Sequence, residues 1–355
     1  MTSIFMVIGI VGWIALLTSI YVYKKAKGER LKSITIDDKE STDPNVVVIG
    51  GGTGQSVFLR GLKKRTRNIT AIVTVADDGG STGRLRKQFH IPAMGDIRNV
   101  MIALSANDDL MTELMEYRFD DPNGTEEDVA GHNLGNLILT ALTQTCGSFF
   151  EAVQKIQNIL NVKGKIIPAT SQVITLYAQM EDGVVVRGEA NIPDVNNHIR
   201  KVFYETFVVA EKEAINAIKE ADLIIYGIGS VYTSILPNVI IPDIRSALQQ
   251  SHAKKVYFCN AMSQPGETDG YSVEDHVEAL KKHGAPVDAV VVASDPIPQK
   301  SIQAYRAEGS TVVSIMKAQH DYQIIEEPLL YFDGHLIRHD PEKIKEVVEK
   351  LVSAL

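Results

Sequence analysis

Hydrophobic and polar positions divide the chain into an uncharged N-terminal run and a body in which apolar runs alternate with amphipathic stretches. The run from Ile4 to Tyr23 carries no charge and, as a helix, would span ~30 Å, the hydrocarbon thickness of a bilayer. No Lys or Arg precedes it, and a basic flank follows it: Lys24, Lys25, Lys27, Arg30 and Lys32. This asymmetry predicts a single-pass membrane anchor with the main domain in the cytoplasm.

Two other interpretations of the apolar run fit less well. A cleaved signal peptide would have a basic start and a small-residue cleavage site, and a buried core helix would show a polar stripe. We therefore predict an anchor with its basic flank over 1–32, a linker over 33–44, and one folded domain over 45–355.

The body alternates between short β-branched runs and amphipathic helices. This pattern predicts an α/β protein with a doubly wound, mostly parallel sheet covered by helices on both faces. One departure is expected, an antiparallel pair over 173–179 and 184–187 around a turn. Expected strands lie at 45–49, 70–76, 222–226, 255–259, 289–293 and 311–315, and a C-terminal helix is expected at 341–354.

Composition narrows the function. The 355 residues carry a formal net charge of −8, which argues against a nucleic-acid partner. Two cysteines cannot build a disulfide scaffold or a four-thiolate zinc site, so a reducing compartment fits. No HExxH or clustered His/Cys spacing predicts a metal ligand set, and the oligomeric state, a homo-oligomer included, stays open.

Glycine-rich turns follow the predicted strands, and the carboxyl ends of such strands are where ligands bind. After the first strand, a turn at the start of a helix suits a phosphate through its amides. Gln55 breaks the dinucleotide spacing G-x-G-x-x-G, and no Gly-Lys-Ser/Thr makes it a Walker loop. The glycine-rich segment is equally well explained as a turn with a purely structural role. The candidate ligand residues here are Gly51, Gly52, Thr53 and Gly54.

The second predicted strand ends in two adjacent carboxylates followed by a Gly/Ser turn and arginines. Carboxylates can hold a metal or accept ribose hydroxyls, and arginines can hold phosphate. The alternative is a solvated acidic turn that caps a helix. The candidates are Asp77, Asp78, Gly80, Ser81 and Arg84. Nearby, the segment 96–99 is equally well an ordinary helix cap with an exposed arginine.

Three further loops carry candidate groups. Asn133 and Asn136 precede an apolar helix, where capping explains Asn133 and a structural role is expected for His132. Hydroxyl and amide donors follow the strand predicted at 222–226. Amide, acid and aromatic groups follow the strand predicted at 255–259, and such groups can bind a base or a sugar. These are Gly229, Ser230, Tyr232 and Thr233, then Asn260, Asp269 and Tyr271. No G-x-S-x-G elbow predicts a nucleophile.

Taken together, the motifs resemble the gluconeogenesis factor branch of the family that also holds the 2-phospho-L-lactate transferases. The resemblance runs from about Asn45 to Asp340 through VVVIGGGTG, ITAIVTVADDGGSTGRLR, GDIRN, GHNLGN, GIGSVYTSILPN and NAMSQPGETDGYSVEDH. It implies a Rossmann-like body that binds a UDP-sugar, notably UDP-N-acetylglucosamine, with Tyr271 and Arg338 as ligand contacts. It also implies support of gluconeogenic growth, cell shape and peptidoglycan synthesis without an established reaction.

Two functions of different classes follow. The first is a membrane-tethered, cytoplasmic UDP-N-acetylglucosamine-binding regulator, which acts with cell-wall synthesis proteins and has no established cofactor. The alternative is a Mg²⁺-dependent transferase resembling 2-phospho-L-lactate transferase, with Asp77 and Asp78 near the ion. Whether any reaction is catalysed stays open at this point.

Overall fold

The computed structural model describes residues 43–66, 68–106, 110–122, 124, 128–195 and 197–355. The predicted membrane anchor at 1–32 and most of the predicted linker lie outside these residues. Within them, no helix has the length and apolarity to cross a bilayer. Residues Asp43–Leu355 form one compact unit.

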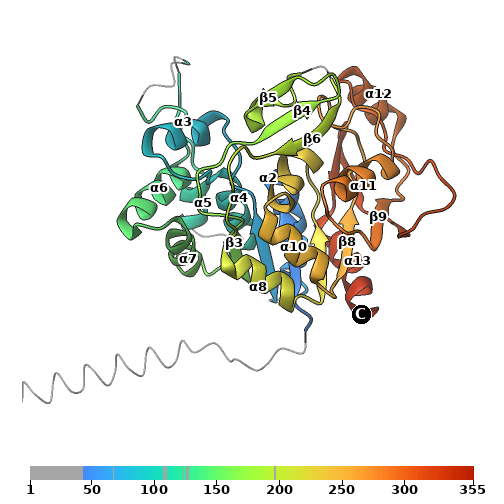
Figure 1. Ribbon diagram of the computed structural model, residues 1–355, viewed down its shortest axis with the longest axis horizontal. Coiled ribbons are helices and arrows are strands. Elements are labelled where there is room, and N and C mark those ends of the chain that lie inside the picture. Colours follow the sequence, from blue (N-terminus) through green and yellow to red (C-terminus); the bar gives the residue numbers. More distant parts are fainter. Residues whose placement is uncertain (1–42, 67, 107–109, 123, 125–127, 196) are drawn as a thin grey trace, which may run out of the picture. The chain divides into compact units, whose positions relative to one another are not determined.

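A seven-stranded sheet organises this unit (Figure 1), and every neighbouring pair in it is parallel. The spatial order is β10-β9-β8-β7-β1-β2-β3, so the direction of winding reverses between β1 and β7. This confirms the predicted doubly wound, mostly parallel fold. The strands are β1 (Val46–Gly50), β2 (Ile69–Val73), β3 (Lys165–Pro168), β7 (Leu223–Tyr226), β8 (Lys254–Phe258), β9 (Ala289–Ala293) and β10 (Gln323–Glu327).

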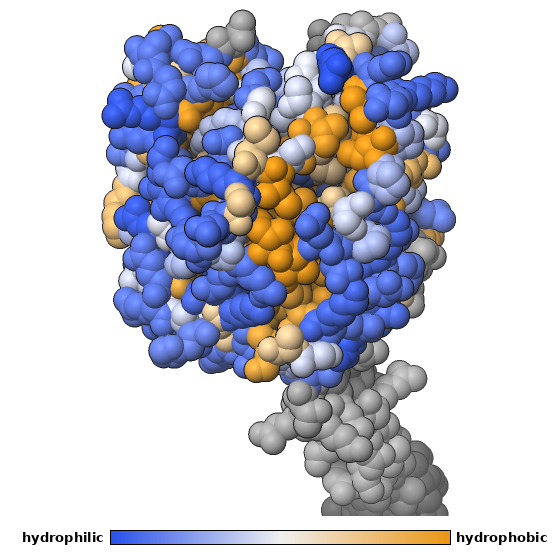
Figure 2. All heavy atoms as spheres, turned by 90° about the vertical axis from the view of Figure 1, so that its right-hand side faces the viewer, coloured by the Kyte–Doolittle hydropathy of each residue, from blue (hydrophilic) through white to orange (hydrophobic). Residues whose placement is uncertain are grey.

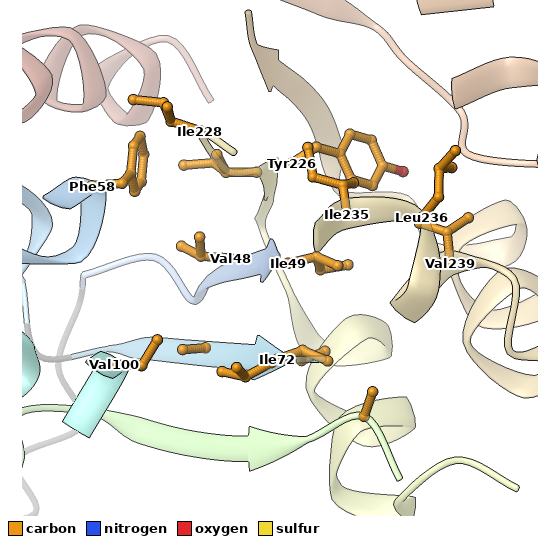
Figure 3. Packing of buried hydrophobic residues seen from close by; sticks show 14 of the residues in the cluster. Val48, Ile49, Phe58, Ile72, Val100, Tyr226, Ile228, Ile235, Leu236 and Val239 are labelled. Carbon is orange, nitrogen blue, oxygen red and sulfur yellow. The ribbon is translucent and has the colours of Figure 1, made fainter. Parts of the chain in front are cut away.

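The central strands are apolar throughout because both faces of the sheet are covered. All five residues of β1 are buried. Figure 3 shows Val48 and Phe58 on one side of β1, whereas Ile49 and Leu236 lie on the other. Successive side chains of a strand point to opposite faces, so a continuous β-branched run fills both halves of the core.

Helices connect the strands and cover both faces. Helix α2 packs against α4 and α13 on one face, and α8 packs against α10. The helices are α2 (Gly52–Leu62), α3 (Gly80–Phe89), α4 (Gly95–Leu104), α5 (Leu110–Glu116), α6 (Leu134–Cys146), α7 (Phe149–Ile159), α8 (Lys212–Glu220), α9 (Leu236–Val239), α10 (Pro242–Gln250), α11 (Val273–Lys282), α12 (Gln299–Ala307) and α13 (Pro341–Ser353), with short turns η1 (Glu189–Asn191) and η2 (Val231–Ile235).

Two smaller antiparallel sheets flank the main one. The predicted antiparallel pair is present as β4 (Tyr177–Met180) and β5 (Val185–Arg187), and β6 (Ile199–Phe203) joins it as a third strand. A hairpin of β11 (Leu330–Asp333) and β12 (Leu336–His339) follows β10 in the chain.

One predicted strand was wrong. Residues 311–315 do not join the sheet, and the last parallel strand is β10 instead. The apolar segment is instead hydrogen-bonded to the loop after β8. The amide of Thr311 donates to Ser263 Oγ at 2.8 Å, and the amide of Val313 donates to the carbonyl of Ala261 at 3.0 Å. Its backbone groups are therefore satisfied outside the sheet.

Figure 2 views the side of the molecule on which β10 ends the sheet. A strip of hydrophobic surface runs down this face between hydrophilic flanks. On the edge strand β10, Ile324 and Ile325 are both partly exposed. An edge strand with partly exposed isoleucines is a place at which other chains can pair.

Candidate functional site

The turns after β1 and β7 touch at the point where the sheet reverses its winding direction. A Cβ placed on Gly54 would lie 2.3 Å from the carbonyl oxygen of Ile228, so no other residue fits there without moving backbone. Gly52 begins α2 with φ of +67°, a conformation that favours glycine. The two turns thus form a single wall at the carboxyl edge, where ligands of such sheets bind.

Side-chain amides hold this wall in place. The Nδ2 of buried Asn238 donates to the carbonyl of Gly50 at 3.0 Å and to that of Ser234 at 2.8 Å. The Nδ2 of Asn260 donates to the carbonyl of Gly229 at 2.9 Å. These side-chain amides tie the end of β1 to the segment after β7, and the turn after β7 to the loop after β8, so they help to fix the spacing of the turns.

A cavity of about 350 Å³, the switch-point cavity, opens between these turns, the loop after β8 and the β11–β12 hairpin. Five of the sequence-predicted residues line it: Thr53, Gly54, Gly229, Asn260 and Arg338. The sequence did not single out the rest of its wall, which includes Met262, Ser263, Tyr305, Tyr331, Ile337 and His339. The cavity thus combines apolar walls with a few polar groups, as small-molecule sites do.

Two members of this wall define its charge. Arg338 is exposed on β12 and pairs across the hairpin with Tyr331. Burial lowers the pKa of His339 to about 4, so its imidazole is neutral at physiological pH. Arg338 is therefore the cation of the cavity wall, where it can meet an anionic ligand.

Carboxylates crowd the adjoining end of β2. Asp77 accepts a bond from the amide of Gly79 at 2.9 Å, and Asp78 accepts one from the amide of Ala190 at 3.0 Å. Burial raises the pKa of Asp77, and Asp78 adds to that rise. Among the residues that the structure describes, no three Asp, Glu, His or Cys side chains are grouped to hold a metal ion.

Two carboxyl groups that the sequence did not mark as ligand residues belong to this crowd. Burial, with repulsion from Asp77, raises the pKa of Asp96 to about 7. Burial, with repulsion from Asp77, Asp96 and other acids, raises that of Glu189 to about 8. Asp96 accepts a bond from the amide of Gly52, so it caps α2 rather than its own helix.

The raised pKa of Asp96 predicts a pH dependence of folding. A carboxyl group with a raised folded-state pKa favours folding most when it is protonated, and that advantage is lost as the pH rises through about 7. Asp96→Asn keeps an acceptor for Gly52 and cannot ionise. We expect it to raise the free energy of unfolding by ~2 kcal/mol at pH 8 and by less at pH 5, because the unfolded carboxyl group ionises above its usual pKa while the folded one stays protonated to about pH 7. Urea denaturation at both pH values measures this, and an equal effect at both would contradict it.

Ser81 lies in a buried polar network at the start of α3. Its Oγ is 2.9 Å from Nδ1 of His132 and 3.4 Å from Nδ2 of Asn136, and Gly80 before it has φ of +46°. The Asn133 side chain accepts from the amide of Asn136 at 3.2 Å, so the expected cap is present. Arg84 donates to the carbonyl of Ala130 at 2.8 Å, joining α3 to the same loop.

The remaining predicted residues form hydrogen bonds within and between the turn after β7 and the loop after β8. Buried Glu267 accepts bonds from the hydroxyls of Ser230 and Thr233. The hydroxyls of Tyr232 and Tyr271 are 2.9 Å apart, and Tyr271 does not line the switch-point cavity. Asp269 accepts from the amide of Gly266 at 2.8 Å, within its own turn. These groups brace the loops behind the cavity.

Comparison with known proteins shows the family to which the chain belongs. The family model described as "2-phospho-L-lactate transferase CofD" matches residues 46–330. The chain therefore belongs to the CofD family.

Within that family the chain is similar to gluconeogenesis factors. The chain is 45% identical over 316 residues to the "Gluconeogenesis factor" of Bacillus subtilis, which covers 87% of this chain and 98% of the relative. It is 41% identical over 320 residues to that of Listeria monocytogenes, which covers 87% and 96%. A crystal structure of a Bacillus halodurans protein superposes with a TM-score of 0.82 at 42% identity, over 87% of this chain and 100% of that one.

Proposed function

We propose that the switch-point cavity binds a UDP-sugar, UDP-N-acetylglucosamine. The observation that carries this proposal is the close approach of Gly54 to Ile228, which makes one ligand wall from the turns after β1 and β7. Amides at the start of α2 suit a diphosphate, and Arg338 offers it a guanidinium. Tyr305 and Tyr331 add rings for a base or sugar.

The bound nucleotide sugar serves as a signal in this proposal. The relatives' name, gluconeogenesis factor, supports a role in carbon metabolism. We extend it to cell shape and peptidoglycan synthesis through wall-synthesis partners, with the protein tethered to the membrane by the apolar run at 4–23. UDP-N-acetylglucosamine is a precursor of the wall, so its binding would couple wall supply to metabolism.

A Mg²⁺-dependent transferase is the second candidate. It is favoured by the crowded carboxyl groups of Asp77, Asp78, Asp96 and Glu189 beside the cavity, and by the family model's description. One or two carboxylates suffice for Mg²⁺ when substrate phosphates complete its coordination, so a divalent cation at Asp77 and Asp78 could polarise a phosphoryl group. Mg²⁺ would then be needed for turnover rather than for binding alone.

Calorimetry with UDP-N-acetylglucosamine tests the proposal. We expect saturable binding, and about tenfold weaker binding for Arg338→Gln, because a guanidinium–phosphate pair is lost. Arg200→Gln is the matched control, since Arg200 is exposed on β6 and does not line the cavity. Absence of binding at millimolar ligand would refute the proposal. Mg²⁺-dependent consumption of the ligand in the same cell would favour the transferase.

A further inference from the structure

A second, smaller cavity lies on the other side of Thr53 from the switch-point cavity. Its volume is about 230 Å³, and it is enclosed by α2, α4, the end of α5 and the cap of α6. Thr53 lines both cavities. We call this second cavity the arginine notch, because Arg60, Arg98 and Arg118 line it.

The arginine notch carries an excess of positive charge. Its three guanidinium groups face a single lining acid, Glu116. Among the described residues, none of the three arginines forms an ion pair. Burial and the neighbouring Arg118 both lower the pKa of Arg98. A recess lined by three cations and one acid is a site that attracts an anion.

Hydrogen-bonding capacity is also left over. Arg98 uses Nη1 on Asn136 at 3.3 Å and Nη2 on Asn99 at 2.6 Å, whereas its buried Nε has no partner. Arg118 uses Nη1 on the carbonyl of Gly131 at 2.7 Å. A guanidinium has five N–H donors in a planar fork that matches phosphate oxygens. Two anchored guanidinium groups with donors to spare are suited to a tetrahedral anion.

We propose that the arginine notch binds a small phosphorylated metabolite, distinct from the ligand of the switch-point cavity. The volume of the notch is below the ~300–1,000 Å³ of sites for drug-sized ligands, which fits a phosphate with a short carbon attachment. Because Thr53 belongs to both walls, two bound ligands would be neighbours. The protein would then sense two metabolites together.

Titration of the full chain with inorganic phosphate and with glycerol 3-phosphate tests this assignment, with glycerol as the uncharged control. Arg60 and Arg118 are exposed, so the fold should tolerate Arg60→Gln/Arg118→Gln. We expect this double variant to bind both phosphates at least tenfold more weakly, because two charge-assisted contacts are lost. Arg200→Gln should bind them as the unmodified protein does, and glycerol should not bind.

Either of two results would overturn the assignment. One is phosphate binding that the double variant leaves unchanged. The other is competitive displacement of phosphate by UDP-N-acetylglucosamine, which would make the notch part of the first ligand's site. The proposed function fails separately: if the nucleotide sugar does not bind but phosphate binding still needs Arg60 and Arg118, the notch stands without it.

Discussion

Gly54→Ala is expected to lower the free energy of unfolding by ~2–3 kcal/mol and to weaken nucleotide-sugar binding at least tenfold. The new methyl group would lie 2.3 Å from the carbonyl oxygen of Ile228, a backbone atom that cannot turn aside. The two turns must separate, and the wall of the switch-point cavity separates with them. The gain in helix propensity from alanine, under ~1 kcal/mol, offsets only part of this cost.

Urea denaturation and calorimetry measure the two effects. Gly79→Ala is the matched control, because Gly79 ends the neighbouring turn with φ of −88° and a Cβ there would meet its nearest atoms at 3.4 Å. The control should lower stability by less than ~1 kcal/mol, the cost of alanine at a helix N-cap. If Gly54→Ala were as stable as the control, the close approach of the two turns would not hold in solution.

Glu267→Ala is expected to lower the free energy of unfolding by ~2 kcal/mol. The carboxylate is buried and accepts from the hydroxyls of Ser230 and Thr233, so its removal leaves two buried donors without their acceptor. It also unlinks the turn after β7 from the loop after β8. Thermal and urea denaturation measure the loss.

Glu267→Gln distinguishes the role of Glu267 as a hydrogen-bond acceptor from the effect of its negative charge. The glutamine keeps an oxygen for both hydroxyls, and burial raises the pKa of Glu267, so a neutral side chain removes the cost of ionisation. We expect Glu267→Gln to be at least as stable as the unmodified protein, by a margin that grows as the pH rises above the usual pKa of a glutamate. Equal losses for the two substitutions would show that packing, rather than hydrogen bonding, holds these loops.

The sheet could be predicted from the sequence because β-branched runs buried on both faces, such as 46–50, fit few other structures. The failure at 311–315 has a clear cause. That segment is as apolar as a strand, but it bonds to the loop at 261–263, and a contact between such distant segments leaves no local pattern. β10 carries two glutamates and only two partly exposed isoleucines, so its pattern is weaker.

The site was predictable where backbone geometry determines it. Glycines at 52, 54 and 229 signalled turns at strand ends, and the structure brings these turns together. Side-chain partners were not predictable. Asp96 caps a helix that starts 44 positions earlier in the chain, at Gly52, and Glu267 reaches back to Ser230. Such pairings depend on tertiary packing, and residue type alone does not specify them.

The chain enters the sheet at one end of β1, and the two candidate ligand cavities lie at the other end. The chain enters the sheet at Asn45, at the amino end of β1, and both cavities lie beyond its carboxyl end at Gly50. Five residues of strand place these two points ~17 Å apart on opposite edges. The start of the described domain thus lies at the edge of the sheet opposite the ligand cavities.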